Sequence, residues 1–435
     1  MKATQIDLIH FRCARQLSMN LEPDLTVLVG VNGAGKSTVL DALAIALSWA
    51  TARVSTPKGS GRRIGEIDIH NDKNFAWIEV ACQTSEDHEE NISWRLSQTR
   101  KGRNPVMDPN DPLHGITSLK SIRVWANQQR KRLSDPSVEA SLPLFVYYPV
   151  NRAVLDIPLR IRKSHAFDLV EAYDNSLTSG ANFRSFFEWY RNREDLENEQ
   201  LRESRRLKED SQLKAVRNAI GIFLPDFSSI SVKRSPLRME VMKGKQRIRV
   251  DQMSDGEKCL FAMVGDLSRR LAIANPTMDN PLHGTGIVLI DEIDLHLHPS
   301  WQRNIVSNLR QTFPNCQFVI STHSPQVFGE VDAQCIRILT VDTLHGLMAT
   351  VPDQALGLDT SEILEEHMEA SSRNQDIEKK LAKIFHLIDK EKFAAAKKGI
   401  AILQSKLHGD IPELVRAQSL ITMLEPEEGE NNEGD

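Results

Sequence analysis

The chain has 435 residues and a formal net charge of −5, with 40% hydrophobic and 26% charged residues. This is the composition of an ordinary globular protein, and the length predicts two or three structural units. The small negative charge gives no whole-chain argument for nucleic-acid binding, and no uninterrupted apolar run is long enough to span a membrane.

The N-terminal sequence and the cysteine pattern together predict a cytoplasmic protein. The N-terminus "MKATQIDLIHFRCARQLSMNL" is interrupted by charges, which is unlike a signal peptide. An odd number of cysteines without a CxxC pair is typical of reduced thiols. The five cysteines are Cys13, Cys82, Cys259, Cys316 and Cys335.

Taken in chain order, the first 150 residues predict strands around one helix. Residues 3–30 alternate between apolar and polar and end in the buried run "LTVLVG", and a helix is expected from Ser37. Two more strands are expected at 74–84 and 91–99, and a buried strand within 141–152.

The next hundred residues differ in character. Residues 165–222 are highly charged with good helix formers, which predicts an exposed helical arm or a short hairpin. Residues 228–252 return to alternation around a turn near Lys243-Gly244, which predicts a β-hairpin.

The last part begins with two strongly apolar strands, 286–292 and 316–325, on either side of a helix near 299–313, a pattern that predicts a parallel sheet. Three short amphipathic helices follow from about Leu358, and the acidic tail is expected to be disordered. We therefore expect an N-terminal lobe at 1–164, a helical arm at 165–222, a C-terminal lobe at 223–355, a helical domain at 356–424 and a tail at 425–435.

The most specific motif is "GVNGAGKST", which fits G-x-x-x-x-G-K-[ST] between a buried strand and a helix. Glycines let backbone N–H groups surround phosphate oxygens, Lys36 supplies a positive charge for the β- and γ-phosphates, and Ser37 places a hydroxyl on Mg²⁺. A chance glycine-rich turn is the weaker alternative. The predicted nucleotide-binding residues are Gly30, Asn32, Gly33, Ala34, Gly35, Lys36, Ser37 and Thr38.

Two acids end the apolar strand "GIVLIDE". A carboxylate at a buried strand end is costly to desolvate without a partner, and the Mg²⁺ of a nucleotide supplies one for Asp291. Glu292 would polarise the attacking water. "VISTHSP" places His323 one strand–helix–strand further on, where it could donate to the γ-phosphate. The simpler alternatives are that the two acids of "GIVLIDE" are merely exposed at a strand end and that His323 has only a structural role.

The string "MSDGE" is, by itself, a helix start with Ser254 as N-cap and Glu257 as its capping-box partner. Its place between the P-loop and "GIVLIDE" resembles the order of motifs in the ABC-type ATPase superfamily, in particular its soluble branch with the RecF-, SMC- and OLD-like ATPases. The resemblance implies a signature loop that binds the γ-phosphate of ATP held by another subunit. The implied signature residues are Ser254, Asp255, Gly256 and Glu257.

The same resemblance implies an α/β ABC-type ATPase head, with a mixed sheet around the P-loop, an antiparallel β-subdomain, a short helical arm and a C-terminal helical domain. Asp294 matches the D-loop by position, whereas neither Gln128 nor Gln129 is assigned with support to the Q-loop. The histidines of "HLHP", His296 and His298, lack a nearby third ligand, so a structural role is favoured over a metal pair.

Within this superfamily, "LFVYYPVNRAVLDIP", "FFEWYRNREDLEN", "DQMSDGEKCLFAMVGDL", "GIVLIDEIDLHLHPSWQ" and "FVISTHSPQV" resemble the PtuA-type ATPases of Septu and retron anti-phage systems. The resemblance implies ATP and Mg²⁺ as cofactors, a homodimer or larger homo-oligomer, and a separately encoded HNH nuclease (PtuB-like) as partner. DNA or RNA would be met through that complex. The C-terminal helices are expected either to dock the nuclease or only to cap the head or mediate self-association.

Two other functions stay open at this stage: a RecF-like repair ATPase that acts directly on DNA, and a nucleotide-bound scaffold with little turnover. A basic stretch at 233–249 could contact a phosphate backbone without sequence specificity. Because Glu240 and Asp251 interrupt it, a solvated hairpin face is slightly favoured.

Overall fold

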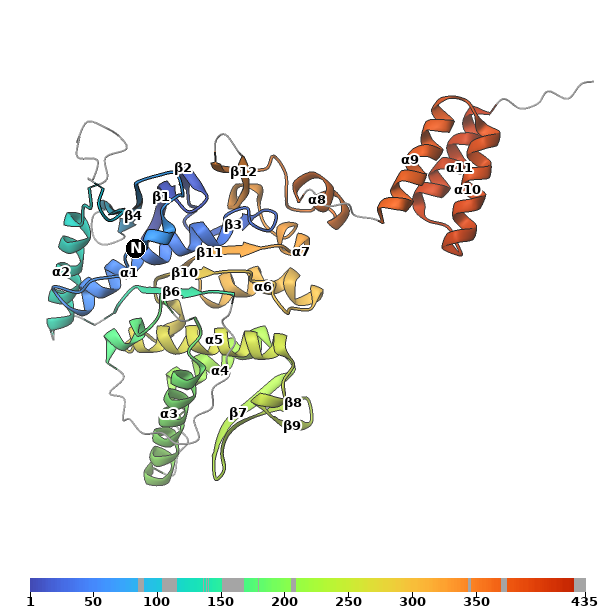
Figure 1. The fold of residues 1–435 in the computed structure, drawn as a ribbon. Coiled ribbons are helices and arrows are strands. Elements are labelled where there is room, and N and C mark those ends of the chain that lie inside the picture. The colour runs from blue at the N-terminus through green and yellow to red at the C-terminus, as the bar shows by residue number, and fades with distance from the viewer. Residues whose placement is uncertain are drawn as a thin grey trace, which may run out of the picture. The chain divides into compact units, whose positions relative to one another are not determined.

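The computed structural model describes residues 1–84, 90–103, 116–135, 137, 139, 141–150, 168–178, 180–204, 209–342, 346–368 and 374–425. The chain divides into two compact units, Met1–Asp359 and Thr360–Asp435 (Figure 1). All five cysteines are free thiols. In the described ranges, no helix has the length and apolar character needed to cross a membrane.

The centre of the first unit is a six-stranded sheet. It consists of β3 (Leu25–Val29), β6 (Leu144–Tyr148), β10 (Gly286–Ile290), β11 (Cys316–Thr322), β12 (Ile336–Asp342) and β13 (Gly346–Thr350). The strand order is β13-β12-β3-β11-β10-β6, and β13 alone runs antiparallel to its neighbour. Every residue of β3, β6, β10 and β11 is buried, as expected of parallel strands covered on both faces.

Helices cover the two faces of this sheet (Figure 1). The helix α1 (Lys36–Ser55) packs on β6, β10 and β11, and α5 (Asp255–Ala274) packs on β6 from the other side. The strands β10 and β11 are joined by α6 (Pro299–Thr312), which confirms the predicted parallel strand–helix–strand unit. A short helix, α7 (Pro325–Phe328), follows β11.

A second sheet lies against α1. Its strands are β1 (Lys2–Phe11), β2 (Ala14–Asn20), β4 (Phe75–Thr84) and β5 (Glu90–Thr99), in the antiparallel order β2-β1-β4-β5. The buried indole of Trp94 on β5 donates to the carbonyl of Ala46 on α1 at 3.0 Å. The helix α2 (Lys120–Ser134) packs on both α1 and β5, so this layer holds α1, and with it the P-loop, in place.

The predicted arm is a helical hairpin of α3 (Phe183–Ser204) and α4 (Ser211–Phe223), but its first half is not exposed. Phe183, Phe186, Phe187 and Tyr190 recur at helical spacing and are buried, and the ring of Phe186 packs on Phe261 of α5. These aromatics, rather than the charges that follow them, decide where the helix lies. Residues 165–167, 179 and 205–208 of the predicted arm lie outside the described residues.

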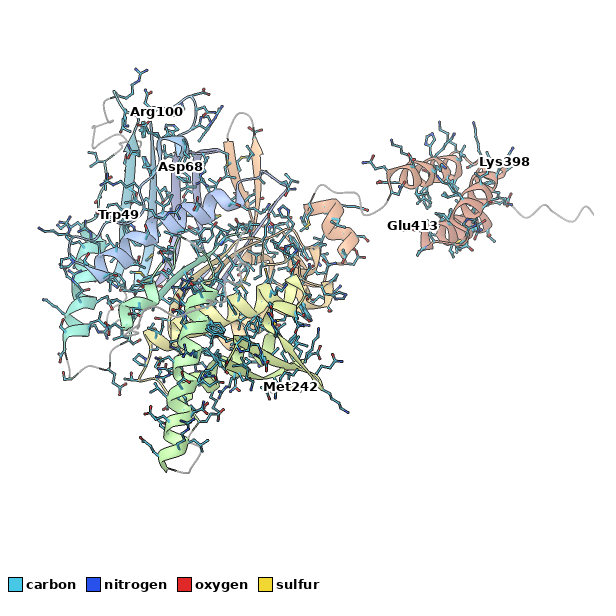
Figure 2. All side chains as sticks on the ribbon, turned by 60° about the horizontal axis from the view of Figure 1, so that its bottom comes forward. Trp49, Asp68, Arg100, Met242, Lys398 and Glu413 are labelled. Atoms are coloured by element: carbon cyan, nitrogen blue, oxygen red, sulfur yellow. The ribbon has the colours of Figure 1, made fainter. Side chains whose placement is uncertain are left out.

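The predicted hairpin is a three-stranded antiparallel sheet of β7 (Phe227–Arg234), β8 (Leu237–Lys243) and β9 (Gln246–Arg249). The turn at Lys243-Gly244 is where the sequence predicts it, and a further turn separates β7 from β8. Most of the basic side chains here pair with acids: Arg234 with Glu194 and Asp195, Arg238 with Glu240, Lys243 with Glu257, and Arg249 with Asp251. Figure 2 places Met242 on this small sheet.

The second unit contains α8 (Thr360–His367), α9 (Gln375–Asp389), α10 (Phe393–Leu407) and α11 (Pro412–Leu424). The last three are the predicted amphipathic helices, and they enclose a core of their own that includes Ile384, Ile400 and Ile421. Polar side chains such as Lys398 project from its surface (Figure 2). From residue 426 onward the predicted acidic tail lies outside the described residues.

Candidate nucleotide site

Three neighbouring strands of the central sheet end at one edge. The P-loop follows β3, Asp291 follows β10 and His323 follows β11, and β11 lies between the other two strands in parallel register. Because the carboxyl ends of parallel strands meet at the same edge of a sheet, these segments are brought together although they are far apart in sequence. We call this group the nucleotide edge: residues 30–38, 291–294 and 321–324.

The P-loop has a shape that requires glycine. Gly33 and Gly35 have φ values of 83° and 92°, in the left-handed region that glycine enters without steric cost. A Cβ on Gly35 would lie 2.9 Å from Cδ1 of Leu347 and 3.0 Å from Sγ of Cys13. Ala34 is buried, whereas Asn32 is exposed at the loop tip. The loop is therefore closely packed on one side and open on the other.

Lys36 is the first residue of α1 and is 6% exposed. Its Nζ donates to the carbonyls of Gly30 at 2.8 Å and Val31 at 3.2 Å. Burial lowers the pKa of Lys36, while the nearby carboxylates of Glu292 and Asp291 act in the opposite direction. The ammonium group thus contacts the first two residues of the P-loop and lies close enough to the acids after β10 to interact with their charges.

Asp291 and Glu292 are held by one serine. Ser321 Oγ donates to Asp291 Oδ1 at 2.5 Å and accepts the N–H of Glu292 at 2.8 Å. Glu292 has a φ of 48°, and a non-glycine residue in this region costs about 1–3 kcal/mol. A hydrogen bond of about 1 kcal/mol from its N–H helps to offset that cost.

A hydrogen bond joins the side chain of Asp294 to the backbone of His323. Asp294 Oδ1 accepts the hydroxyl of Thr322 at 2.6 Å and the N–H of His323 at 3.3 Å. Burial and then the charge of Lys36 lower the pKa of His323, against the effect of Asp294 and the other two acids. The imidazole therefore lies close enough to Lys36 and to the acids for their charges to shift its pKa.

A magnesium ion fits this edge without a dedicated cage. Mg²⁺ at nucleotide sites takes one or two protein ligands besides phosphate oxygens and water. The sequence predicts the hydroxyl of Ser37 and the carboxylate of Asp291 as this pair, and Ser37 is exposed near the start of α1. No group of three or more His, Cys, Asp or Glu side chains that could hold a metal occurs in the described part of the chain. His298 instead caps α6, with its Nδ1 2.8 Å from the hydroxyl of Ser300.

The signature segment, residues 254–257, begins α5 as the capping box that the sequence predicts. Ser254 Oγ accepts the N–H of Glu257 at 3.4 Å, and Glu257 Oε2 accepts the N–H of Ser254 at 2.9 Å. The other oxygen of Glu257 accepts Lys243 Nζ at 2.6 Å. Burial would raise the pKa of Glu257, but the hydrogen bonds from Lys243 and Ser254 outweigh it, so the pKa lies below its usual value.

Gly256 packs the signature segment against the chain that follows Asp291. A Cβ on Gly256 would lie 2.3 Å from the carbonyl oxygen of His296. Close approach to a phosphate is thus not the only reason for a glycine here. Ser254 and Asp255 are exposed. Among the described residues, no hydrogen bond joins 254–257 to the P-loop.

The two glutamines considered for the Q-loop lie elsewhere. Gln128 and Gln129 are in α2, beside Arg130, whose guanidinium donates to the carbonyl of Arg53 near the far end of α1. With a rise of 1.5 Å per residue, that carbonyl is about 25 Å along α1 from Lys36. Neither glutamine therefore reaches the P-loop.

Sequence reasoning missed two side chains that hold the nucleotide edge together. Ser321 lies inside the string that pointed to His323 but received no role. Gln302 on α6 donates to the carbonyl of Asp294 at 3.3 Å and that of Leu297 at 3.0 Å, and it accepts the hydroxyl of Ser324 at 2.8 Å. No local pattern identifies either residue, because their partners come from other segments.

The chain resembles known proteins in sequence over most of its length. A sequence profile described as "AAA domain" matches residues 5–225, which is half of the chain, and a second AAA-domain profile matches residues 153–329. The chain is 32% identical to the retron Ec83 probable ATPase of Escherichia coli over 440 residues, covering 87% of this chain and 78% of that protein.

Two further relatives also match most of this chain. The retron Vc95 probable ATPase of Vibrio cholerae is 32% identical over 73% of this chain and 69% of its own length. The Septu protein PtuA of Bacillus thuringiensis is 22% identical over 72% of this chain and 69% of its own length. Among solved structures, an SMC head bound to the C-terminal winged-helix domain of ScpA has a TM-score of 0.49 at 16% identity, covering 81% of this chain and 98% of that one.

Proposed function

Since the chain belongs to the AAA-domain ATPase family that includes the retron Ec83 and Vc95 ATPases, we propose that it is the regulatory ATPase of an anti-phage defence complex. In this proposal ATP and Mg²⁺ bind at the nucleotide edge, two copies of the chain close around them, and the closed state controls a partner nuclease. A nucleotide bound between two subunits biases their assembly, because its contacts exist only in the closed state.

The roles at the nucleotide edge follow from the chemistry of each side chain. The P-loop amides and Lys36 hold the phosphates, and Ser37 and Asp291 hold Mg²⁺. Glu292 polarises the attacking water for in-line transfer of the γ-phosphate. His323 donates one ring N–H to the γ-phosphate.

The observation that carries the dimer proposal is the exposure of the signature segment. Ser254 and Asp255 are exposed at the N-terminus of α5, where backbone N–H groups and the helix dipole favour an anion. Within the described residues, no hydrogen bond joins them to the P-loop of their own chain. A second copy of the chain would supply the γ-phosphate that this segment binds, and Asp294 would lie near the boundary between the copies.

The partner is proposed from the resemblance to PtuA-type ATPases, which implies an HNH nuclease encoded by a separate gene. The helical unit of this chain offers a surface for it. Four large apolar side chains on α10 and α11 are exposed: Ile402 at 58%, Val415 at 49%, Met423 at 81% and Leu424 at 56%. If these side chains form one contiguous patch, they would mark a protein-binding surface, and we propose this unit as the docking region.

The test is the trapped closed state. Glu292→Gln should keep ATP binding, lose at least about 100-fold in turnover and run as a stable dimer or larger assembly with ATP and Mg²⁺ in light scattering. Lys36→Ala should neither bind ATP nor assemble. A Glu292→Gln protein that remains monomeric with saturating ATP, or that hydrolyses ATP at the wild-type rate, would contradict the proposal. Co-purification with the product of a neighbouring HNH gene tests the partner separately.

A further inference from the structure

Ser321 is buried at the end of β11, beside the end of β10. The last paired residues of the two strands are Ile320 and Ile290, so Ser321 lies one step beyond them, level with Asp291. A serine at this place is completely shielded from water. Its hydroxyl needs partners within the protein, and the structure shows which ones it has.

The hydroxyl of Ser321 both donates and accepts a hydrogen bond. It donates its single proton to Asp291 Oδ1 at 2.5 Å and accepts the N–H of Glu292 at 2.8 Å. The backbone of Ser321 adds a third contact, because its carbonyl accepts the N–H of Ile293 at 2.9 Å. One residue of β11 therefore contacts three consecutive residues after β10.

These contacts help to orient both acids. Oδ1 of Asp291 is occupied by a donor, which sets the rotation of the carboxylate about its Cβ–Cγ bond. The N–H of Glu292 is held where its backbone has a φ of 48°, and this turn decides the direction of the Glu292 side chain. Without the hydroxyl, Asp291 and the turn at Glu292 would each lose one of the hydrogen bonds that hold them.

We propose that Ser321 is a positioning residue for ATP hydrolysis, which orients the Mg²⁺ ligand Asp291 and the water-activating Glu292 with one hydroxyl. The inference rests on the roles proposed above for these two acids. Side chains that hydrogen-bond a metal ligand tune its affinity and geometry, and their loss typically costs 10–100-fold in activity or metal affinity.

The chain offers a matched control in Ser48 on α1. Ser48 is also buried, donates to the carbonyl of Ile45 at 2.6 Å and accepts the N–H of Arg62 at 2.7 Å. Ser48→Ala and Ser321→Ala each remove one hydroxyl that makes two hydrogen bonds. A purely structural role of Ser321 predicts similar effects of the two changes, whereas a positioning role predicts that turnover falls only in Ser321→Ala.

The experiment measures ATPase kinetics as a function of ATP and Mg²⁺ for wild type, Ser321→Ala, Ser321→Thr and Ser48→Ala, each below its own melting temperature. For Ser321→Ala we expect kcat to fall roughly 10–100-fold and the Mg²⁺ concentration for half-maximal rate to rise, with nucleotide affinity in EDTA unchanged. Ser321→Thr, which restores the hydroxyl, should recover most of the rate. Ser48→Ala should keep the wild-type kcat.

Two outcomes would overturn the inference: a Ser321→Ala protein with wild-type kcat and Mg²⁺ dependence, or the same loss of kcat in Ser48→Ala. Glu292→Gln measured in parallel separates this result from the proposed function. If Glu292→Gln is inactive while Ser321→Ala is normal, only the role of Ser321 fails. If Glu292→Gln turns over at the wild-type rate, the assignment of the acids fails instead.

Discussion

The nucleotide edge and the signature segment belong to one proposed catalytic site, yet they are built in opposite ways. At the nucleotide edge Lys36, Asp291 and Thr322 are buried, and hydrogen bonds link strands that are distant in sequence. The polar groups of the signature segment instead find their hydrogen-bond and ion-pair partners among residues nearby in the sequence. Its capping box lies within four residues, and the ion pair of Glu257 is with Lys243, only 14 residues earlier.

The difference indicates what each part can do without a partner. The nucleotide edge has Lys36, its acids and His323 within one chain, so we expect a single chain to bind ATP. The signature segment is a well-formed helix N-terminus with Ser254 exposed, which is ready for an anion that its own chain does not bring to it. Substitutions that alter the signature segment and leave the nucleotide edge intact, or the reverse, test this difference between the two parts.

The largest effect is expected from Ser254→Asp. Aspartate is as good an N-cap as serine, so the free energy of unfolding should change little. Its negative charge would, however, face the γ-phosphate in the closed dimer and remove the hydroxyl donor. We expect ATP-dependent assembly to be lost and turnover to fall about 100–1,000-fold.

The control for this variant is Ser254→Ala, which adds no charge but loses the cap, at about 1 kcal/mol of stability. Urea unfolding and ATPase assays on the two variants separate capping from catalysis. Wild-type turnover in Ser254→Asp would show that Ser254 is only a helix cap.

A smaller effect is expected from Gly256→Ala. The new Cβ would lie 2.3 Å from the backbone oxygen of His296, so α5 or the segment after Asp291 has to shift. Overpacking of this kind costs about 1–3 kcal/mol, measurable by urea unfolding. Gly221→Ala in α4 is the matched control, since a Cβ there has no atom within 4 Å, and it should be neutral or stabilising. Equal stability of the two variants would rule out the close approach.

The smallest effect concerns pH. Burial and Lys36 lower the pKa of His323 below its ordinary value of about 6.5, so below that pH the unfolded chain binds a proton that the folded chain does not. The contribution of His323 to the free energy of unfolding is therefore complete above pH 6.5. It decreases as the pH falls toward the lowered pKa that His323 has in the folded chain. The melting temperature of wild type should therefore drop more between about pH 7.5 and 5.5 than that of His323→Gln. Equal drops would contradict the shifted pKa.

The sequence was most informative where function depends on local pattern. The P-loop needs glycine at fixed places before Lys36, and the capping box needs Ser254 and Glu257 three residues apart, so both could be predicted without a structure. The parallel arrangement of β10 and β11 followed from two apolar runs around a helix. In each case the information lies within a few turns of the chain.

What could not be predicted depends on segments meeting in space. Ser321 and Asp291 are 30 residues apart and touch only because β11 pairs with β10. Gly256 and His296 are also distant in sequence, yet a Cβ on Gly256 would lie 2.3 Å from the carbonyl oxygen of His296. The buried half of α3 is a different case: its aromatic residues carry the pattern, but the charged residues after them led to the prediction of an exposed arm.

The most direct test of the central claim, a site completed by a second copy, is a mixed dimer. Lys36→Ala and Ser254→Asp, each inactive alone, are co-expressed with different tags, and assemblies that carry both tags are purified. In a two-fold symmetric dimer one of the two sites then has an intact P-loop and an intact signature, so turnover should return to about half of the wild-type value per dimer. Turnover no higher than that of the single variants would contradict the account.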